Sequence, residues 1–120
     1  MDNELTKVII NSSYKVYNYL GSGFSEKVYC EALEIEFHNN SILFKRENEI
    51  PIYYKNIKLN CLYKADFVCY NQILIEVKAV KYIDAIHYAQ ILNYLKATKL
   101  KIGLIINFGG KELEIKRFIL

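Results

Sequence analysis

One stretch of the sequence, residues 73–80, reads ILIEVKAV and has the composition of a strand inside a sheet. Branched aliphatic residues dominate it, as they do in strands that are buried on both faces. Residues two apart in a strand point to the same side, so Glu76 and Lys78 share one face while the aliphatic residues beside them face the other. The pattern therefore places two ionisable groups together on an otherwise apolar strand.

A third ionisable residue, Asp66, stands ten positions before Glu76. If the two residues lie on neighbouring strands their carboxylates converge, and at a separation of ~4 Å and an effective dielectric of ~20 they repel by about 4 kcal/mol. A proton or a bound cation relieves this repulsion, and oxygen ligands without His or Cys favour Mg²⁺ or Mn²⁺ over zinc. The alternative is a structural pair of Glu76 with Lys78 on the solvent face of an antiparallel strand.

Two helices are expected before this region. Apolar residues at near-helical spacing predict the first over Leu5–Leu20, with Gly21 ending it in the left-handed conformation. Ser25 is placed to cap a second helix that ends at Asn39 and Asn40. Its inner face would carry Val28, Tyr29, Ala32, Leu33 and Phe37.

The period then becomes that of strands, and three are expected, at residues 50–54, 59–63 and 73–80. Asn56 and the pair Tyr70-Asn71 supply turns whose short spacing favours a hairpin or meander. Pro51 cannot donate a hydrogen bond to a neighbouring strand, so it predicts an edge or an interruption there.

A third helix is expected from a cap at Asp84 to about Thr98, followed by strands at residues 101–107 and 113–119 around Gly109-Gly110. The order of elements is α-α-β-β-β-α-β-β. This order predicts an α/β fold, with a mixed sheet flanked by helices.

Composition limits the class of protein. With 120 residues, 52% of them hydrophobic, and a single Pro, the chain is expected to form one domain over residues 1–120. No signal peptide or apolar run of ~20 residues is evident, so a cytoplasmic protein without a membrane partner is expected. A net charge of +3 permits a nucleic acid partner without requiring one. Three cysteines without a C-x-x-C pair predict buried free thiols, not a disulfide or zinc site: Cys30, Cys61 and Cys69.

Ordered motifs give the sequence a resemblance to a known family. Residues 23–29, GFSEKVY, match a G-x-x-E-x-x-Y signature, and Asp66, the E-x-K of residues 76–78 and the Q-x-x-x-Y of residues 90–94 follow in order. In this arrangement the sequence resembles the GxxExxY proteins of the PD-(D/E)XK nuclease superfamily. Ala65 stands where the superfamily name has Pro.

The resemblance implies a PD-(D/E)XK nuclease-like core in which acidic residues surround a divalent metal, Mg²⁺ or Mn²⁺. Asp66 and Glu76 would be its ligands, with the Val77 carbonyl oxygen as a third, and Lys78 would be the lysine of the E-x-K motif. Glu26 would complete the metal shell directly or through water.

Further residues are assigned around this core. Gln90 matches the glutamine of the Q-x-x-x-Y motif and is interpreted as a site residue that positions a phosphate. Tyr29, His87 and Tyr94 are expected in a supporting or substrate-binding role, although Tyr29 equally fits a place in the core and His87 a helix-forming role. The eleven tyrosines are interpreted mainly as packing residues, and none is assigned to nucleic acid bases.

The expected function is metal-dependent hydrolysis of phosphodiester bonds in nucleic acid, with DNA preferred over RNA. Asp66 and Glu76 would hold Mg²⁺, and Lys78 would position the attacking water. The alternative is a catalytically silent nucleic-acid-binding or scaffold protein on the same fold. A 120-residue core has no room for a separate recognition domain, so a homodimer or a larger partner protein is expected.

Overall fold

The computed structural model describes residues 2–120, and the side chains from residue 4 onward. Three helices and seven strands form in the described chain. In order they are α1 (Asp2–Leu20), α2 (Glu26–Asn39), β1 (Phe44–Ile50), β2 (Tyr53–Tyr54), β3 (Ile57–Lys58), β4 (Tyr63–Cys69), β5 (Ile73–Lys78), α3 (Ala85–Thr98), β6 (Ile102–Asn107) and β7 (Glu114–Ile119).

Five of the strands form one mixed sheet in the order β1-β4-β5-β6-β7. β1, β4 and β5 make an antiparallel meander, β5 and β6 run parallel, and β7 returns antiparallel to β6. The parallel pair needs a crossover connection, which α3 provides. The predicted α/β class with a mixed sheet flanked by helices is therefore confirmed.

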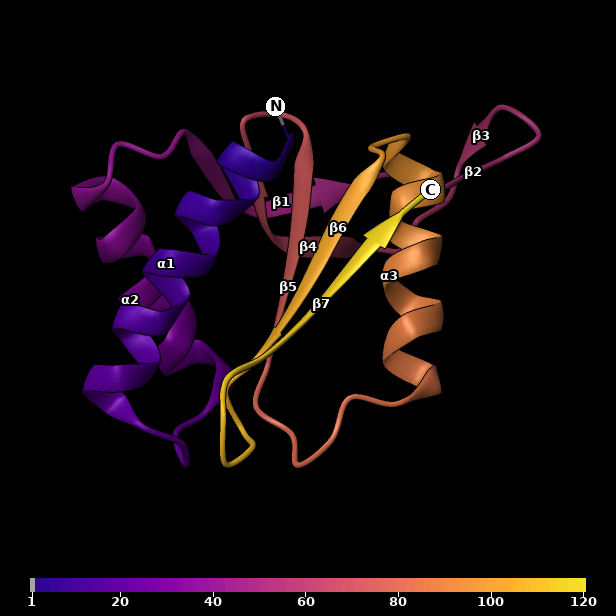
Figure 1. Ribbon diagram of the computed structural model, residues 1–120. Coiled ribbons are helices and arrows are strands. Elements are labelled where there is room, and N and C mark those ends of the chain that lie inside the picture. The colour runs from indigo at the N-terminus through magenta and orange to yellow at the C-terminus, as the bar shows by residue number, and fades with distance from the viewer. Residues whose placement is uncertain (1) are drawn as a thin grey trace.

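The helices cover opposite faces of the sheet, with α1 and α2 on one side and α3 on the other (Figure 1). Alternate residues of β5 pack against the helices on opposite faces of the sheet. Ile75 and Val77 belong to the apolar cluster under α1 and α2, whereas Leu74 packs in the cluster under α3. Both faces of β5 are thus buried, which explains its near-continuous aliphatic sequence.

The predicted helices form close to their expected limits. Gly21 has a φ of 69° directly after α1, and the Asp84 side chain accepts a hydrogen bond from the Ile86 N–H at the start of α3. Val28 is the exception on the predicted inner face of α2, because its side chain is exposed. Cys30, one turn after Glu26, is buried instead and packs in the core.

The boundaries predicted for the first two strands are wrong. β1 begins at Phe44, before the predicted start, and β4 covers Tyr63–Cys69 instead of residues 59–63. β1 lies at an edge of the sheet and alternates partly buried with exposed residues, so its charged sequence FKRENEI hides the apolar period. Pro51 directly follows its last residue, as an edge or an interruption requires.

Residues 53–58 form a two-stranded hairpin, β2–β3, around the predicted turn at Asn56. A hairpin or meander was expected there, but its separation from the five-stranded sheet was not. Its turn residues Lys55 and Asn56 both have positive φ, and so do Tyr70 and Asn71 between β4 and β5. Both predicted turns are therefore confirmed. Cys61 lies after the hairpin and is exposed, which corrects the expectation of three buried thiols; Cys30 and Cys69 are buried.

Candidate functional site

Strands β4 and β5 separate where the two predicted acids lie. Their backbone pairing runs from Cys69–Ile73 to Phe67–Ile75. Beyond that point side chains replace the backbone partners: the Asp66 N–H donates to Glu76 Oε2 over 3.1 Å, and the Val77 N–H donates to Asp66 Oδ2 over 2.7 Å. The two carboxyl groups therefore lie in the gap between the strands, and the expected proximity of Asp66 and Glu76 is observed.

The strand alternation also breaks at Asp66. Phe67 packs under α1 and α2, yet Ala65, two residues away, packs in the cluster under α3. On the neighbouring strand the residue opposite Asp66 is Glu47, which has a φ of 52° and no register partner. Such a local irregularity re-aims side chains and is frequent beside functional sites. Here it turns Asp66 toward Glu76.

The two carboxyl groups are poorly hydrated. Glu76 is 5% exposed, and burial, followed by the charge of Asp66, raises its pKa to about 8. Burial also raises the pKa of Asp66, with the charge of Glu26 as a further cause. Two acids with raised pKa values favour a shared proton or a bound cation.

A chain of polar contacts connects β5 to α3. Lys78 Nζ donates to Gln90 Oε1 over 2.9 Å, and Gln90 Nε2 donates to Tyr94 Oη over 3.2 Å. The charge of Lys78 also lowers the pKa of both Asp66 and Glu76, so its ammonium group lies within electrostatic reach of the acids. Of the residues predicted on α3, Gln90 and Tyr94 thus join the site.

Glu26 approaches from the other layer. It occupies the exposed first turn of α2, and its charge raises the pKa of both Asp66 and Glu76. Carboxylates in the first turn of a helix are also favoured by the helix dipole. The structure therefore brings Glu26 near the acid pair, but at the solvent-exposed rim.

Tyr29, which was predicted to support the site, contacts groups other than the acids. The Tyr29 hydroxyl donates to the Gly21 carbonyl over 2.5 Å and accepts from the Phe24 N–H, while its ring stacks on Phe108 at 4.4 Å. Tyr29 therefore holds the loop that leads into α2 and does not bond an acid.

His87 is engaged at the start of α3. Its Nδ1 accepts a hydrogen bond from the Asp84 N–H over 3.1 Å, completing a capping box. The imidazole thus stabilises the helix that carries Gln90 and Tyr94.

Sequence reasoning missed Arg46 and Cys30, which lie near the acids. The charge of Arg46 lowers the pKa of Asp66, while its guanidinium donates to Glu34 over 2.7 Å. Burial, followed by the charge of Asp66, raises the pKa of Cys30 to about 12. Arg46 lies on β1, whose period the sequence concealed, and Cys30 gave no signal as a single thiol.

The donor set is compatible with a hard divalent cation. Each of the two hydrogen bonds above uses one oxygen of its carboxyl group, and each group has a second oxygen to offer. Mg²⁺ commonly takes one or two carboxylates and keeps several waters. Within the described part of the chain no cluster of three or more His, Cys, Asp or Glu residues is arranged to hold a metal. Asp66 and Glu76 therefore fit as a two-carboxylate site completed by water or a carbonyl oxygen.

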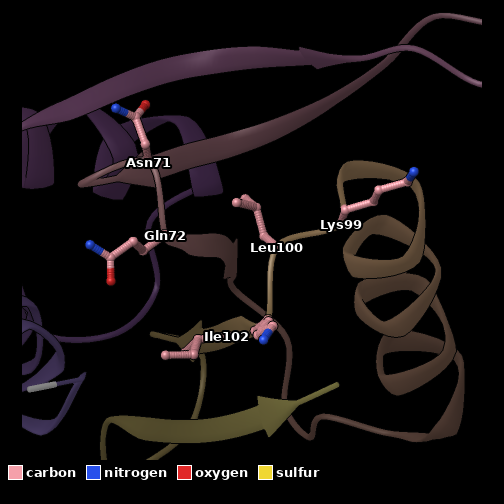
Figure 2. Close-up of a pocket in the computed structure, with 6 residues that line it drawn as sticks. Asn71, Gln72, Lys99, Leu100 and Ile102 are labelled. Carbon is pink, nitrogen blue, oxygen red and sulfur yellow. The ribbon is translucent and has the colours of Figure 1, made fainter.

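A groove of about 460 Å³ adjoins the polar chain on α3. It is lined by Ile52, Tyr63, Ile86, Ala89, Gln90, Asn93 and Tyr94. A second, smaller hollow of about 250 Å³ lies at the opposite end of β5, between the Asn71-Gln72 turn and residues 99–102 (Figure 2). Gln72 precedes Glu76 by four residues, about 13 Å along an extended strand, so that hollow is separate from the acids.

The sequence matches the model of a known protein family. The model of the PD-(D/E)XK nuclease superfamily matches residues 3–118. The chain belongs to the PD-(D/E)XK nuclease superfamily. Members of this superfamily are usually nucleases or other phosphodiesterases and commonly use divalent metals.

A solved structure has a fold similar to that of this chain. The crystal structure of SSO0001 aligns with a TM-score of 0.59 at 18% sequence identity, over 78% of this chain and 48% of that one. The chain thus spans about half the length of that protein, and the likeness concerns the fold. A comparison with curated protein sequences finds no match. No helix in the described part of the chain is long and apolar enough to cross a membrane.

Proposed function

We propose that this superfamily member is a metal-dependent nuclease that hydrolyses phosphodiester bonds, with DNA preferred over RNA. One observation carries the proposal: the carboxyl groups of the buried Glu76 and the half-buried Asp66 lie in the gap between β4 and β5, with Lys78 beside them. Burying two like charges is costly without a compensating cation. Within the superfamily we assign the chain to the GxxExxY group, on residues 23–29.

The proposed roles of the acids follow from their contacts. Asp66 and Glu76 would hold Mg²⁺ or Mn²⁺ through the oxygens that point away from the backbone N–H groups, and the Val77 carbonyl would be a third ligand. The bound cation would polarise the phosphate and lower the pKa of an attacking water. Glu26, at the exposed rim, would complete the site through water.

The proposed role of Lys78 is to orient the attacking water and to stabilise charge that develops on the phosphate. Gln90 restricts the ammonium group by accepting a hydrogen bond from it, and Tyr94 in turn holds the Gln90 amide. Gln90 also has its amide at the edge of the α3 groove, where a phosphate oxygen could be bound. His87 and Tyr29 would act indirectly, by holding α3 and the loop before α2.

The second candidate is a catalytically silent binding or scaffold protein on the same fold. It is favoured by the sparse ligand set, since two carboxylates and no third clustered acid are found within the described residues. We also propose that the protein works as a homodimer or with a larger partner, because two sites are a simple means of cutting a duplex.

Cleavage assays with purified protein test the function. Single- and double-stranded DNA and RNA are incubated with Mg²⁺, with Mn²⁺ or with chelator. We expect metal-dependent cleavage that Asp66→Asn abolishes, because the amide keeps the shape of the side chain but loses its charge. Glu31→Gln, a matched change of an exposed acid on α2, should cleave normally. Absence of cleavage under every condition would favour the scaffold protein.

A further inference from the structure

The segment between β1 and β4 forms an arm that exposes aromatic and aliphatic side chains. It consists of β2, β3 and the residues around them, 51–64, and extends past α3 on the side away from α1 and α2 (Figure 1). Its large exposed side chains are between 36% and 67% exposed: Tyr53, Tyr54, Ile57, Leu59, Leu62 and Tyr63. Tyr53 and Tyr54 are consecutive in β2, so their side chains point to opposite faces of the hairpin.

The charge of this arm has one sign. It carries Lys55, Lys58 and Lys64, and no Asp or Glu occurs between Glu49 and Asp66. The whole chain has 16 basic and 13 acidic residues, so outside the arm, with its three lysines, the two signs balance. Lys55 Nζ lies 5.4 Å from the centre of the Tyr54 ring, so cation and aromatic face are presented together. This combination is complementary to a polyanion with flat aromatic groups.

The arm is continuous with the candidate site through the α3 groove. Ile52 and Tyr63 form one wall of the groove, and Gln90 and Tyr94 form part of the other. The Tyr63 ring meets the Tyr94 ring edge to face at 5.9 Å. Tyr94 is in turn bonded to Gln90, which holds Lys78. A strand lying along the arm would therefore be led toward Lys78 and the acid pair.

We propose that the β2–β3 arm and the adjoining groove bind a single strand of nucleic acid beside the candidate site. Bases would stack on Tyr53, Tyr54 and Tyr63, and lysines of the arm would contact phosphates. The bases of a duplex are already stacked on each other, so a single strand or a frayed end fits these tyrosines. This inference rests on the proposed function for its substrate class.

Binding in chelator tests the arm without requiring cleavage. The affinity of a labelled single-stranded DNA of ~20 nucleotides is measured for the wild type and for Tyr53→Ala/Tyr54→Ala. Loss of two stacking surfaces should weaken binding by about 30-fold or more. Tyr53→Phe/Tyr54→Phe keeps the rings and should bind as the wild type does. The matched control is Tyr14→Ala/Tyr19→Ala, which removes two exposed tyrosines from α1.

The lysines are tested by salt dependence. Replacing Lys55, Lys58 and Lys64 with Gln should lower the slope of log affinity against log salt by about 0.7 for each lost phosphate contact. Thermal melting should show that all variants remain folded, because the altered side chains are exposed.

Several results would overturn the inference: no binding of single-stranded DNA or RNA by the wild type, equal affinities in the arm and control variants, or a changed oligomeric state with unchanged affinity. The last result would assign the arm to contact between copies of the chain. Arm-dependent binding without metal-dependent cleavage would refute the proposed nuclease activity and leave the arm inference standing. Metal-dependent cleavage by a protein whose affinity does not depend on the arm would refute the arm inference and leave the proposed nuclease activity standing.

Discussion

Glu76 and Lys78 show how neighbouring residues on one strand can have separate tasks. Glu76 accepts a hydrogen bond from the backbone of Asp66, across the gap between β4 and β5. Lys78, at the end of β5, donates to Gln90 on α3. The lysine is therefore held by a residue other than the acid beside it. This arrangement permits Lys78 to be removed without displacing the carboxylates.

The first prediction concerns Lys78→Ala. In the proposed mechanism this change removes the donor and positive charge near the reacting phosphate, and losses of this kind commonly cost on the order of 10² to 10³ in rate, about 3 to 4 kcal/mol. Metal affinity should be equal to or slightly above that of the wild type, because a like charge has gone. Cleavage rate and calorimetric metal binding are the two measurements.

Glu76→Ala is the contrasting variant and should lose both metal binding and cleavage. Lys116→Ala, at an exposed position on β7, is the neutral control. A Lys78→Ala protein that cleaves at nearly the wild-type rate would show that the lysine is only structural.

The elements around the site are held in place by the end of β6. The buried Asn107 side chain accepts from the N–H groups of Val80 and Gly109 and donates to the Val80 carbonyl, at 2.9 to 3.1 Å. Gly109 lies so close to Val80 that an added Cβ would be 2.4 Å from its carbonyl oxygen. These contacts fix the position of the segment between Lys78 and α3. The spacing of Lys78 and Gln90 thus depends on a residue outside the site.

The second prediction is that Asn107→Ala destabilises the protein by about 3 kcal/mol or more. Alanine would leave several backbone groups of the buried connection without partners, and each such group costs about 1 to 3 kcal/mol. Urea denaturation measures the change in the free energy of unfolding.

Asn18→Ala, at an exposed position of α1, is the matched control and should be close to neutral. An Asn107→Ala protein with wild-type stability would contradict this role of the Asn107 contacts.

At the scale of the whole molecule, two layers of packing on one sheet bury Glu76 and leave Asp66 half-buried. α1 and α2 cover one face and α3 the other, so β5 is buried along most of its length. Burial raises the pKa of Glu76 from 4.5 to about 8. The folded protein therefore binds more protons than the unfolded chain between these pH values. Any such difference makes stability depend on pH.

The third prediction is that, in chelator, the free energy of unfolding falls as the pH rises from about 5.5 to 8.5. The contribution of Glu76 is fully favourable below pH 4.5 and is lost as the pH rises through the folded pKa of about 8, because the buried group must then ionise. Thermal melting at several pH values measures this trend. Glu76→Gln should flatten it, since the amide does not titrate.

Mg²⁺ should reverse the loss at pH 8, because an ion that binds only the folded state stabilises it by mass action, by about 2.7 kcal/mol at a concentration of 100 times Kd. The same addition should leave Glu76→Gln nearly unchanged. A wild-type melting temperature indifferent to Mg²⁺ and Mn²⁺ would contradict the metal site.

Local sequence determined much of this fold. The helices, the β5 strand and the tight turns follow from apolar period, the Asp84 cap and the positive φ tolerated at Asn56 and Asn71. Ser25 stands at the predicted N-cap position of α2, but its side chain makes no capping hydrogen bond. The sharing of one strand face by Glu76 and Lys78 follows from the two-residue period alone. Membership in the PD-(D/E)XK nuclease superfamily was visible in the order of the motifs, whereas the GxxExxY assignment and the roles of the site residues stay predictions.

Tertiary structure decided what depends on contacts between distant segments. β1 is an edge strand whose charged residues conceal its period, so its start, and with it Arg46 near Asp66, appears only once β4 pairs with it. Tyr29 bonds the loop before α2, and His87 bonds the backbone at the start of α3. These contacts likewise depend on which backbone groups the fold leaves without a partner. Exposure of Tyr53 and Tyr54 is decided in the same way: a tyrosine's sequence neighbours do not reveal whether another layer covers it, and no layer in the described chain covers the β2–β3 hairpin.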